Sequence, residues 1–353
     1  MIKFSVNNFT KKIIFIKLLF VGYKLCFNNV IKTNKYYLHS QKKMSQTVTS
    51  RLAPTPSGYL HLGNAFNFLL TALLVDWQAG PLHLRIDDLD GPRVERSAVE
   101  DIFVQLEWLG IDYNSGPSGP DELFKQYSQH TRKERYHETL EILRKSGHLF
   151  ACECSRSEIR QLSKSGSYPG TCRDKDLDLM DENLSWRVHV PDQTYVNFKT
   201  ITDTCEKINV AQAMGDFIVK RKDGIPAYQL ASVVDDLELG VNLVVRGQDL
   251  WASTAAQLFL AQCLNDQNFP ATRFVHHRLI TDNSGAKLSK SAGALSLKVL
   301  REKHHTPVWI YQETAKILQL PFEEIRTLDN LKEVFRSAML QKNGLQTMLV
   351  QGK

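Results

Sequence analysis

The stretch that decides the fold is "RLAPTPSGYLHLGNAFNFLL", residues 51–70. After Arg51 it has two apolar residues and then two prolines, which end a strand because proline cannot donate a hydrogen bond to a sheet. Beyond Gly63, apolar residues recur at helical spacing, at Phe66, Leu69, Leu70 and Leu73. We therefore predict a strand, a turn and a buried helix that has His61 at its N-terminus.

The N-terminus of this helix is a candidate phosphate site. The first turn of a helix has unpaired backbone N–H groups and a partial positive charge, which suit an anion. Gly63 would let a ligand approach closely, and the His61 imidazole would add a donor. Taken alone, these residues fit a proline-rich surface loop with an exposed histidine equally well.

The pattern continues with alternating strands and helices. A short apolar strand at 82–86 precedes Asp87 and Asp88, and helices are predicted at 97–110 and 131–146. Further strand-like runs are at 186–190, 216–221, 228–234, 242–247 and 274–280, with a helix at 249–265 and helical sequence beyond 295. Such alternation predicts an α/β fold with a parallel sheet, whose ligand crevice lies beyond the carboxyl ends of the strands.

Composition indicates a globular protein that is large enough for a sizeable core. The chain has 353 residues, 42% of them hydrophobic, and a formal net charge of +6. Nine lysines and no acid lie within residues 1–43, so the remainder has 35 basic and 38 acidic residues. Any contact of the folded part with a polyanion therefore needs a local patch.

Residues 1–43 form a Lys-rich leader. Its apolar run at 13–21 is too short to cross a bilayer and lacks the features of a signal peptide. We expect a disordered leader or an over-extended reading frame whose translation starts at Met44, with organelle targeting as the alternative. Nothing else suggests a membrane, so a cytoplasmic protein is expected.

A second basic element, "GAKLSKS", covers residues 285–291. Two lysines, Lys287 and Lys290, are three residues apart between glycines. Such a loop could close over a triphosphate and neutralise the leaving pyrophosphate. The alternative is a solvated surface loop.

Three of the six cysteines, Cys152, Cys154 and Cys172, are clustered in sequence. They lie in a segment, 148–185, that has few core residues and looks inserted. Clustered thiols favour a metal over disulfides, and zinc takes four ligands. Spacing leaves the fourth open, with His148 as a candidate, and reduced cysteines without a metal are the alternative.

Together, "HLGN" and "KLSKS" resemble the two signature motifs of class I aminoacyl-tRNA synthetases. The likeness to the glutamyl branch extends over about residues 50–300. It includes "LRIDDLDGPR", "EWLGIDYNSGP" and "DFIVKRKDGIPAYQLASVVDDLELGVNLVVRGQDL". It implies a Rossmann-like parallel sheet with an inserted zinc-binding, acceptor-type subdomain and a short helical C-terminal part.

The length of the C-terminal part is typical of a sub-family. About 60 residues follow Ser291, too few for a helical anticodon-binding domain. The chain in this respect is similar to the glutamyl-queuosine tRNA(Asp) synthetase family, which attaches glutamate to queuosine in the anticodon. The expected organisation is a leader at 1–43, catalytic core at 44–147 and 186–294, zinc insertion at 148–185 and helical segment at 295–353.

The resemblance implies roles for individual residues. His61, Gly63, Asn64, Lys287 and Lys290 would bind ATP, which is used with Mg²⁺, and His61 and the two lysines would be catalytic. Glutamate would bind to Arg51, Ala53, Thr55, Asp87, Tyr228 and Arg246, with the arginines on its carboxylates and Asp87 on its ammonium group. One structural Zn²⁺ would bind to Cys152, Cys154, Tyr168 and Cys172, with His148 in reserve.

The chain departs from the family pattern at three positions. Asn64 replaces a histidine, and Asp87 is one methylene shorter than the usual Glu, which weakens the inference of glutamate. Gln248 in "RGQD" replaces an acid of the full-length enzymes and favours the shortened sub-family.

The partners implied are L-glutamate, ATP and tRNA(Asp) with queuosine, for a monomer. Residues 131–137 and 300–305 are candidate basic patches for tRNA, or else solvated helix faces. Rival hypotheses are a truncated glutamyl-tRNA synthetase that charges a 3′ end, a non-catalytic homologue and a nucleotidyl transferase that makes a small metabolite.

Overall fold

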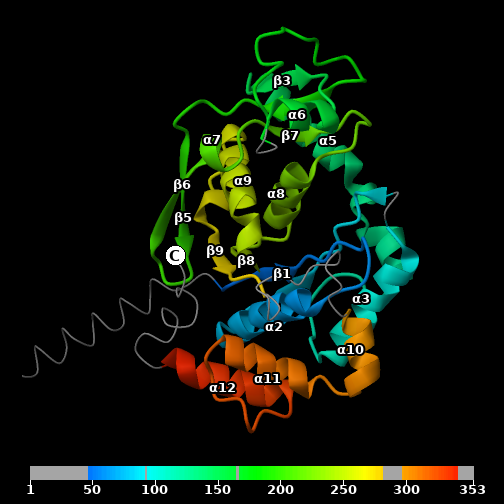
Figure 1. Cartoon of the computed structure of the whole chain (residues 1–353), viewed down its shortest axis with the longest axis vertical. Helices are drawn as coiled ribbons and strands as arrows, with labels where there is room; N and C mark the ends of the chain where they lie inside the picture. The colour runs from blue at the N-terminus through cyan, green and yellow to red at the C-terminus, as the bar shows by residue number, and fades with distance from the viewer. Residues whose placement is uncertain (1–46, 92–93, 164–166, 281–295, 341–353) are drawn as a thin grey trace, which may run out of the picture. The chain divides into compact units, whose positions relative to one another are not determined.

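A parallel sheet lies at the centre of the fold, as predicted (Figure 1). The structure is a computed structural model that describes residues 47–91, 94–163, 167–280 and 296–340. Strand β1 (Ser50–Leu52) pairs in parallel with β2 (Leu82–Leu84), and β8 (Leu243–Gly247) pairs in parallel with β9 (Arg273–His277). The Thr49 carbonyl joins the two pairs, because it accepts from the N–H groups of Asn242 and Leu243 at 3.0 and 3.1 Å.

Strand β9 also pairs in parallel with β5 (Tyr195–Thr200), and β5 pairs antiparallel with β6 (Cys205–Asn209) at the edge. Side chains of successive residues in a strand point to opposite faces. Along β8, Leu243 and Val245 belong to one hydrophobic cluster and Val244 to another. Both faces of the sheet are therefore covered, as expected of a parallel sheet.

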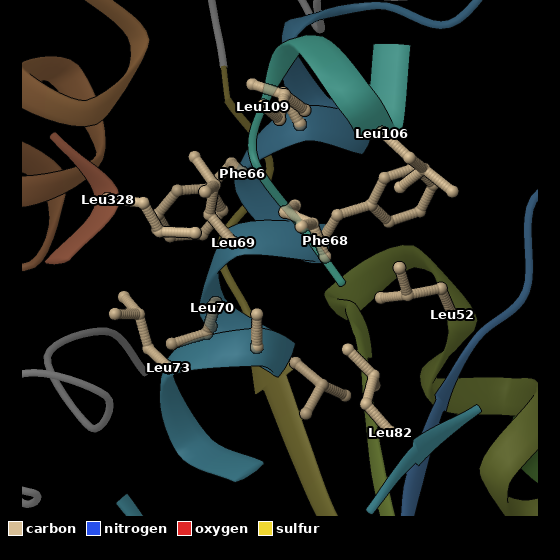
Figure 2. Close-up of a cluster of buried hydrophobic side chains, with 14 of the residues drawn as sticks. Leu52, Phe66, Phe68, Leu69, Leu70, Leu73, Leu82, Leu106, Leu109 and Leu328 are labelled. Atoms are coloured by element: carbon tan, nitrogen blue, oxygen red, sulfur yellow. The ribbon is translucent and has the colours of Figure 1, made fainter. Parts of the chain in front are cut away.

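Helix α2 (Leu62–Trp77) forms the centre of the first cluster. Residues 68–75 of this helix are all buried. It packs against β1 and β8 on one side and against α11 (Val308–Ile317) and α12 (Leu328–Leu340) on the other. Figure 2 shows Phe66 and Leu69 of α2 with Leu328 of α12. A helix enclosed on several sides needs apolar residues all round, which explains its sequence.

The second cluster packs α8 (Tyr228–Glu238) and α9 (Trp251–Cys263) against the other face of the sheet. The other helices have the following bounds: α3 (Arg96–Trp108), α4 (Pro120–Glu122), α5 (Lys133–Lys145), α6 (Arg156–Leu162), α7 (Val210–Ala213) and α10 (Leu297–His304). The helical character predicted beyond 295 is confirmed by α10, α11 and α12.

The run at 228–234, predicted as a strand, is helical, and that prediction was wrong. The neighbouring Val233 and Val234 favour a strand locally. The buried positions, however, extend without a break from Leu230 through Asp236, as in a helix enclosed on several sides. Packing against α9 and α5 outweighs the β propensity of two valines.

A second, antiparallel sheet contains β3 (Leu149–Cys152), β4 (Ser185–Val188) and β7 (Phe217–Lys220) in the order β3-β4-β7. It holds the cysteine segment against the second cluster. The predicted end of the insertion, residue 185, is the first residue of β4. One partner of β4, β3, precedes this boundary in sequence, and the other, β7, follows it.

The leader at 1–43 and the "GAKLSKS" loop lie outside the described residues. Among the helices that the structure describes, none has the length and apolar character required to cross a membrane.

Candidate active site

His61 is the residue before the first turn of α2. Its backbone N–H donates to the Asn64 Oδ1 at 3.0 Å. Asn64, which replaces the family's second histidine, thus closes the start of the helix. At Gly63 an added Cβ would lie 2.9 Å from the Cε1 atom of His61, so glycine makes room for the imidazole.

Described residues near both ends of the lysine loop lie beside α2 or the residues just before it. Ser296, which follows the loop, forms a β-bridge with His61, and the Leu297 N–H donates to the Leu60 carbonyl at 2.8 Å. On the preceding side, the His277 ring lies 3.1 Å from the Asn67 Oδ1. Lys287 and Lys290 themselves are outside the described residues, so their roles remain predictions.

Arg51 of β1 belongs to a buried chain of charges. Its Nε donates to the Asp236 Oδ1 at 2.8 Å, and the same oxygen accepts from the Arg85 Nη1 at 2.6 Å. The Arg85 Nε donates to the Asp87 Oδ1 at 2.6 Å. All four residues are buried. Charges buried to this degree are tolerated only when they are paired.

Asp235 extends this network toward α5. It accepts from the Gln129 amide at 2.8 Å, the Arg132 Nε at 2.9 Å and the Tyr136 hydroxyl at 2.9 Å. Burial raises the pKa of Tyr136, and the neighbouring Asp235 raises it further. Arg132 and Tyr136 belong to the patch at 131–137, and both are engaged within the protein.

The carboxyl groups of the network respond differently to burial. Burial raises the pKa of Asp87 and outweighs the opposing effect of Arg85. Burial also acts to raise the pKa of Asp236, but Arg51 and Arg85 flank this carboxyl and hold its pKa below the ordinary value. Asp236 is therefore the firmly ionised centre of the network.

Three of the predicted glutamate-binding residues line one cavity of about 270 Å³: Thr55, Asp87 and Tyr228. Ala53 is not among its lining residues, although it lies between Arg51 and Thr55 in sequence. Two arginines that sequence reasoning missed, Arg156 of α6 and Arg221 after β7, also line this cavity. The cavity therefore combines acidic, basic and aromatic groups, as a site for a zwitterion requires.

Arg246, at the carboxyl end of β8, is buried near Tyr228. Its Nη1 donates to the Gln257 Oε1 at 2.8 Å and its Nη2 to the Thr254 Oγ1 at 2.5 Å. Burial lowers the pKa of Arg246 to about 10, while Tyr228 acts to raise it. The guanidinium is thus cationic at neutral pH and poorly neutralised, which suits an anionic ligand.

Arg85 and Asp236 could have been suspected from the sequence. Each is a charge within a run that otherwise has the pattern of a buried element, and such charges need partners. The partners themselves could not be inferred, because Arg51 and Asp236 are 185 residues apart.

The cysteine segment brings four potential ligands together. The sulfur atoms of Cys152, Cys154 and Cys172 all lie within 4.8 Å of one another. The Tyr168 hydroxyl is 3.5 Å from the Cys152 sulfur. His148 is not part of the cluster found among the described residues.

This donor set fits tetrahedral zinc. With Zn–S bonds of about 2.3 Å, sulfur atoms around one zinc are about 3.8 Å apart, and the Cys154 and Cys172 sulfurs are separated by 3.6 Å. Burial acts to raise the pKa of Cys152, but Tyr168 and Arg187 outweigh it and lower this pKa to about 7. A thiolate, the form that binds metal, is thereby favoured at Cys152.

The second basic patch, 300–305, is partly used for packing. Leu300 is buried, and the His304 ring stacks on Trp309 with centroids 5.6 Å apart. Its role in tRNA contact stays a prediction.

Comparisons with known proteins identify the family of the chain. Residues 47–348 match the family model described as "tRNA synthetases class I (E and Q), catalytic domain". The glutamyl-Q tRNA(Asp) synthetase of Parasynechococcus marenigrum (strain WH8102) is 40% identical over 72% of this chain and 78% of that protein. Glutamate–tRNA ligase 2 of Syntrophus aciditrophicus (strain SB) is 33% identical over 83% of this chain, which spans 62% of that ligase.

The glutamate–tRNA synthetase of Elizabethkingia anophelis shares the fold with a TM-score of 0.67. At 22% identity, the match covers 82% of this chain and 66% of that structure.

The fold and the site therefore define a class I aminoacyl-tRNA synthetase of the glutamate and glutamine branch, a ligase-type enzyme. Within that branch the chain belongs to the glutamyl-Q tRNA(Asp) synthetases, and the resemblance stated from the sequence is confirmed.

Proposed function

We propose that the chain activates L-glutamate with ATP and transfers the glutamyl group to queuosine in the anticodon of tRNA(Asp). The observation on which this depends most is the cavity that Thr55, Asp87 and Tyr228 line together. Relatives named glutamyl-Q tRNA(Asp) synthetase, which match over most of their length, support the acceptor.

In the first step, a carboxylate oxygen of glutamate attacks the α-phosphorus of ATP. The bond between the α-phosphorus and the bridging oxygen breaks, and pyrophosphate leaves with both electrons of that bond. Mg²⁺ would accompany the ATP phosphates. His61 and the N–H groups at the start of α2 would stabilise the phosphates, and Lys287 and Lys290 would neutralise the charge on pyrophosphate.

In the second step, a queuosine hydroxyl attacks the carbonyl carbon of the glutamyl-adenylate. An ester forms, AMP leaves, and the hydroxyl proton passes to AMP or solvent. No covalent enzyme intermediate is needed, so positioning and charge stabilisation account for the catalysis.

The residues proposed for glutamate already have partners. Asp87 would hold the ammonium group while it keeps its bond to Arg85, and Arg51 would bind a carboxylate through its Nη atoms, because its Nε is paired with Asp236. Tyr228 and Arg246 would hold the other carboxylate. The hydrogen bonds that these residues already make keep the groups in place before substrate arrives.

Cys152, Cys154, Tyr168 and Cys172 would hold a structural zinc ion. Zinc would tie the segment between β3 and β4 together, because this segment has few buried apolar residues of its own. No step of the reaction requires it.

The test is an assay with labelled glutamate, ATP and tRNA from cells with and without queuosine, using protein that starts at Met44. We expect label only on the queuosine-containing tRNA, and none with the K290A variant. Equal labelling of both tRNA pools would overturn the proposed acceptor.

The likeness to a glutamate–tRNA ligase favours charging of a tRNA 3′ end as the second candidate. A tRNA(Asp) that lacks its 3′-terminal adenosine distinguishes the two. It should still accept glutamate if queuosine is the acceptor, and loss of labelling would favour 3′ charging.

Pyrophosphate exchange that depends on glutamate would exclude a non-catalytic homologue, and exchange with a different acid would favour the small-metabolite transferase.

A further inference from the structure

We propose that a cavity of about 320 Å³ between the cysteine segment and the start of α8 binds the acceptor nucleoside, unstacked from the anticodon loop. This inference rests on the proposed function and names a site that would present the nucleoside to activated glutamate.

The position of the cavity is the first argument. Ile218, Ala227 and Tyr228 line both this cavity and the one assigned to glutamate. A nucleoside held here would be next to the amino-acid site, because the two cavities share these three lining residues. Transfer requires this proximity, because the reacting hydroxyl and carbonyl must meet.

The chemistry of the lining is the second argument. The guanidinium carbon of Arg187 lies 3.9 Å from the ring centroid of Tyr168, so a planar cation and an aromatic ring are already stacked there. Unpaired bases in RNA are recognised by stacking on aromatic and arginine planes and by hydrogen bonds to their edges. A volume of this size is at the lower end of the range for small-molecule sites.

Two lining residues have unused hydrogen-bonding capacity. The Arg187 Nε and the Gln229 Oε1 are buried and have no partner among the described residues. Arg187 is only 5% exposed. A buried donor or acceptor left without a partner is costly, so these two groups, on residues that line one cavity, would gain from a ligand that supplies both partners.

The wall of this cavity is fixed to the cysteine cluster. Arg173, the residue after Cys172, donates to the two Asp216 carboxylate oxygens at 2.5 and 3.0 Å. The Asp216 carbonyl in turn accepts from the Arg187 Nη1 at 3.0 Å. Asp216 thus joins the proposed zinc segment to the arginine of the nucleoside cavity.

The experiment fills the cavity. Met214 lines it and is not part of the glutamate cavity, so M214W should obstruct the nucleoside alone. Its control is M180W, because Met180 lines a separate cavity of about 530 Å³. Glutamate-dependent pyrophosphate exchange should be unchanged in both variants.

We expect M214W to lower kcat/KM for glutamylation of queuosine-containing tRNA(Asp) at least about tenfold, the scale of one lost base-stacking contact. M180W should match the wild type. A second variant, Q229M, removes the amide at similar size and should raise KM for tRNA without reducing exchange. The inference would be overturned if M214W or Q229M matched the wild type in both pyrophosphate exchange and glutamylation of tRNA.

Failure of the proposed function looks different from failure of this inference. If the wild type itself shows no glutamate-dependent exchange or no labelling of queuosine-containing tRNA, the proposed function is wrong. If the wild type shows both exchange and labelling, but M214W transfers glutamate to tRNA as well as M180W does, the proposed function stands. The nucleoside then binds elsewhere.

Discussion

At the start of α2, a single glycine determines where the imidazole can lie. The sequence motif indicates that Gly63 lets a ligand approach closely. In the structure, however, the group nearest to a Cβ added at Gly63 is the ring of His61. The glycine therefore positions the histidine, whatever it does for the ligand. Asn64 closes the same turn through its bond to the His61 N–H.

A G63A substitution should accordingly displace the His61 ring. A misplacement of about 1 Å can cost on the order of 100-fold in rate, so we expect a loss on this scale in pyrophosphate exchange with little change in thermal stability. G119A is the matched control, because a Cβ there meets nothing within 4 Å. Exchange in G63A at the level of G119A would contradict this role.

Asp236 should be the most stability-sensitive residue of the charge network. D236N leaves the Arg51 and Arg85 guanidinium groups, both buried, without their shared carboxylate. Breaking a buried pair in this way costs about 3–5 kcal/mol in the free energy of unfolding. Urea unfolding of D236N and of D121N, which alters an exposed pair, measures the difference; equal stabilities would contradict the prediction.

The dependence of this loss on pH follows from the pKa of Asp236. Because its folded pKa is below the ordinary value of 3.8, the carboxylate stabilises the fold above that pH, and this contribution disappears as the pH falls through the folded pKa. We expect the stability gap between wild type and D236N to be largest near neutral pH and to narrow on acidification. A gap that is constant from neutral pH to pH 3 would show that ionisation of Asp236 is not its cause.

On the scale of elements, the sequence predicted what local patterns determine. The strands β1, β2, β8 and β9 and the helices α2, α5 and α9 are predicted from the pattern of apolar residues. Helix α8 was not, because paired valines and adjacent acids give opposite local signals and only tertiary packing decides between them. The ionic partners of α8 lie on β1, just after β2, just before α5 and on α5, at distances in sequence that no local rule covers.

The N-terminal residue of α8 gives a direct test of the site. Tyr228 lines the glutamate cavity and contributes to the electrostatic environment of Arg246. Y228F removes a hydrogen bond to a charged group, worth about 1.5–3 kcal/mol, so KM for glutamate in the exchange reaction should rise at least about tenfold. Y195F, at an exposed tyrosine of β5, should leave KM unchanged; an unchanged KM in Y228F would remove this residue from the site.

For the molecule as a whole, the cysteine cluster predicts both the metal content of the protein and a contribution to its stability. We expect about one zinc per chain, because the ligand set is that of a closed structural site. C172S should lose the metal and unfold at lower urea concentration, whereas C205S, at an exposed cysteine outside the cluster, should retain it. Metal analysis and urea unfolding of both variants provide the measurement, and a metal-free wild type would favour three reduced thiols.

The enclosure of α2 has a consequence for how the polypeptide is made. This helix leaves the ribosome early, yet α11 and α12, which cover its outer side, are encoded more than two hundred residues later. The counter-ion of Arg51 is likewise translated long after β1. A nascent chain must therefore keep one of its most apolar helices from premature association during most of its synthesis, and we expect an early dependence on ribosome-associated chaperones.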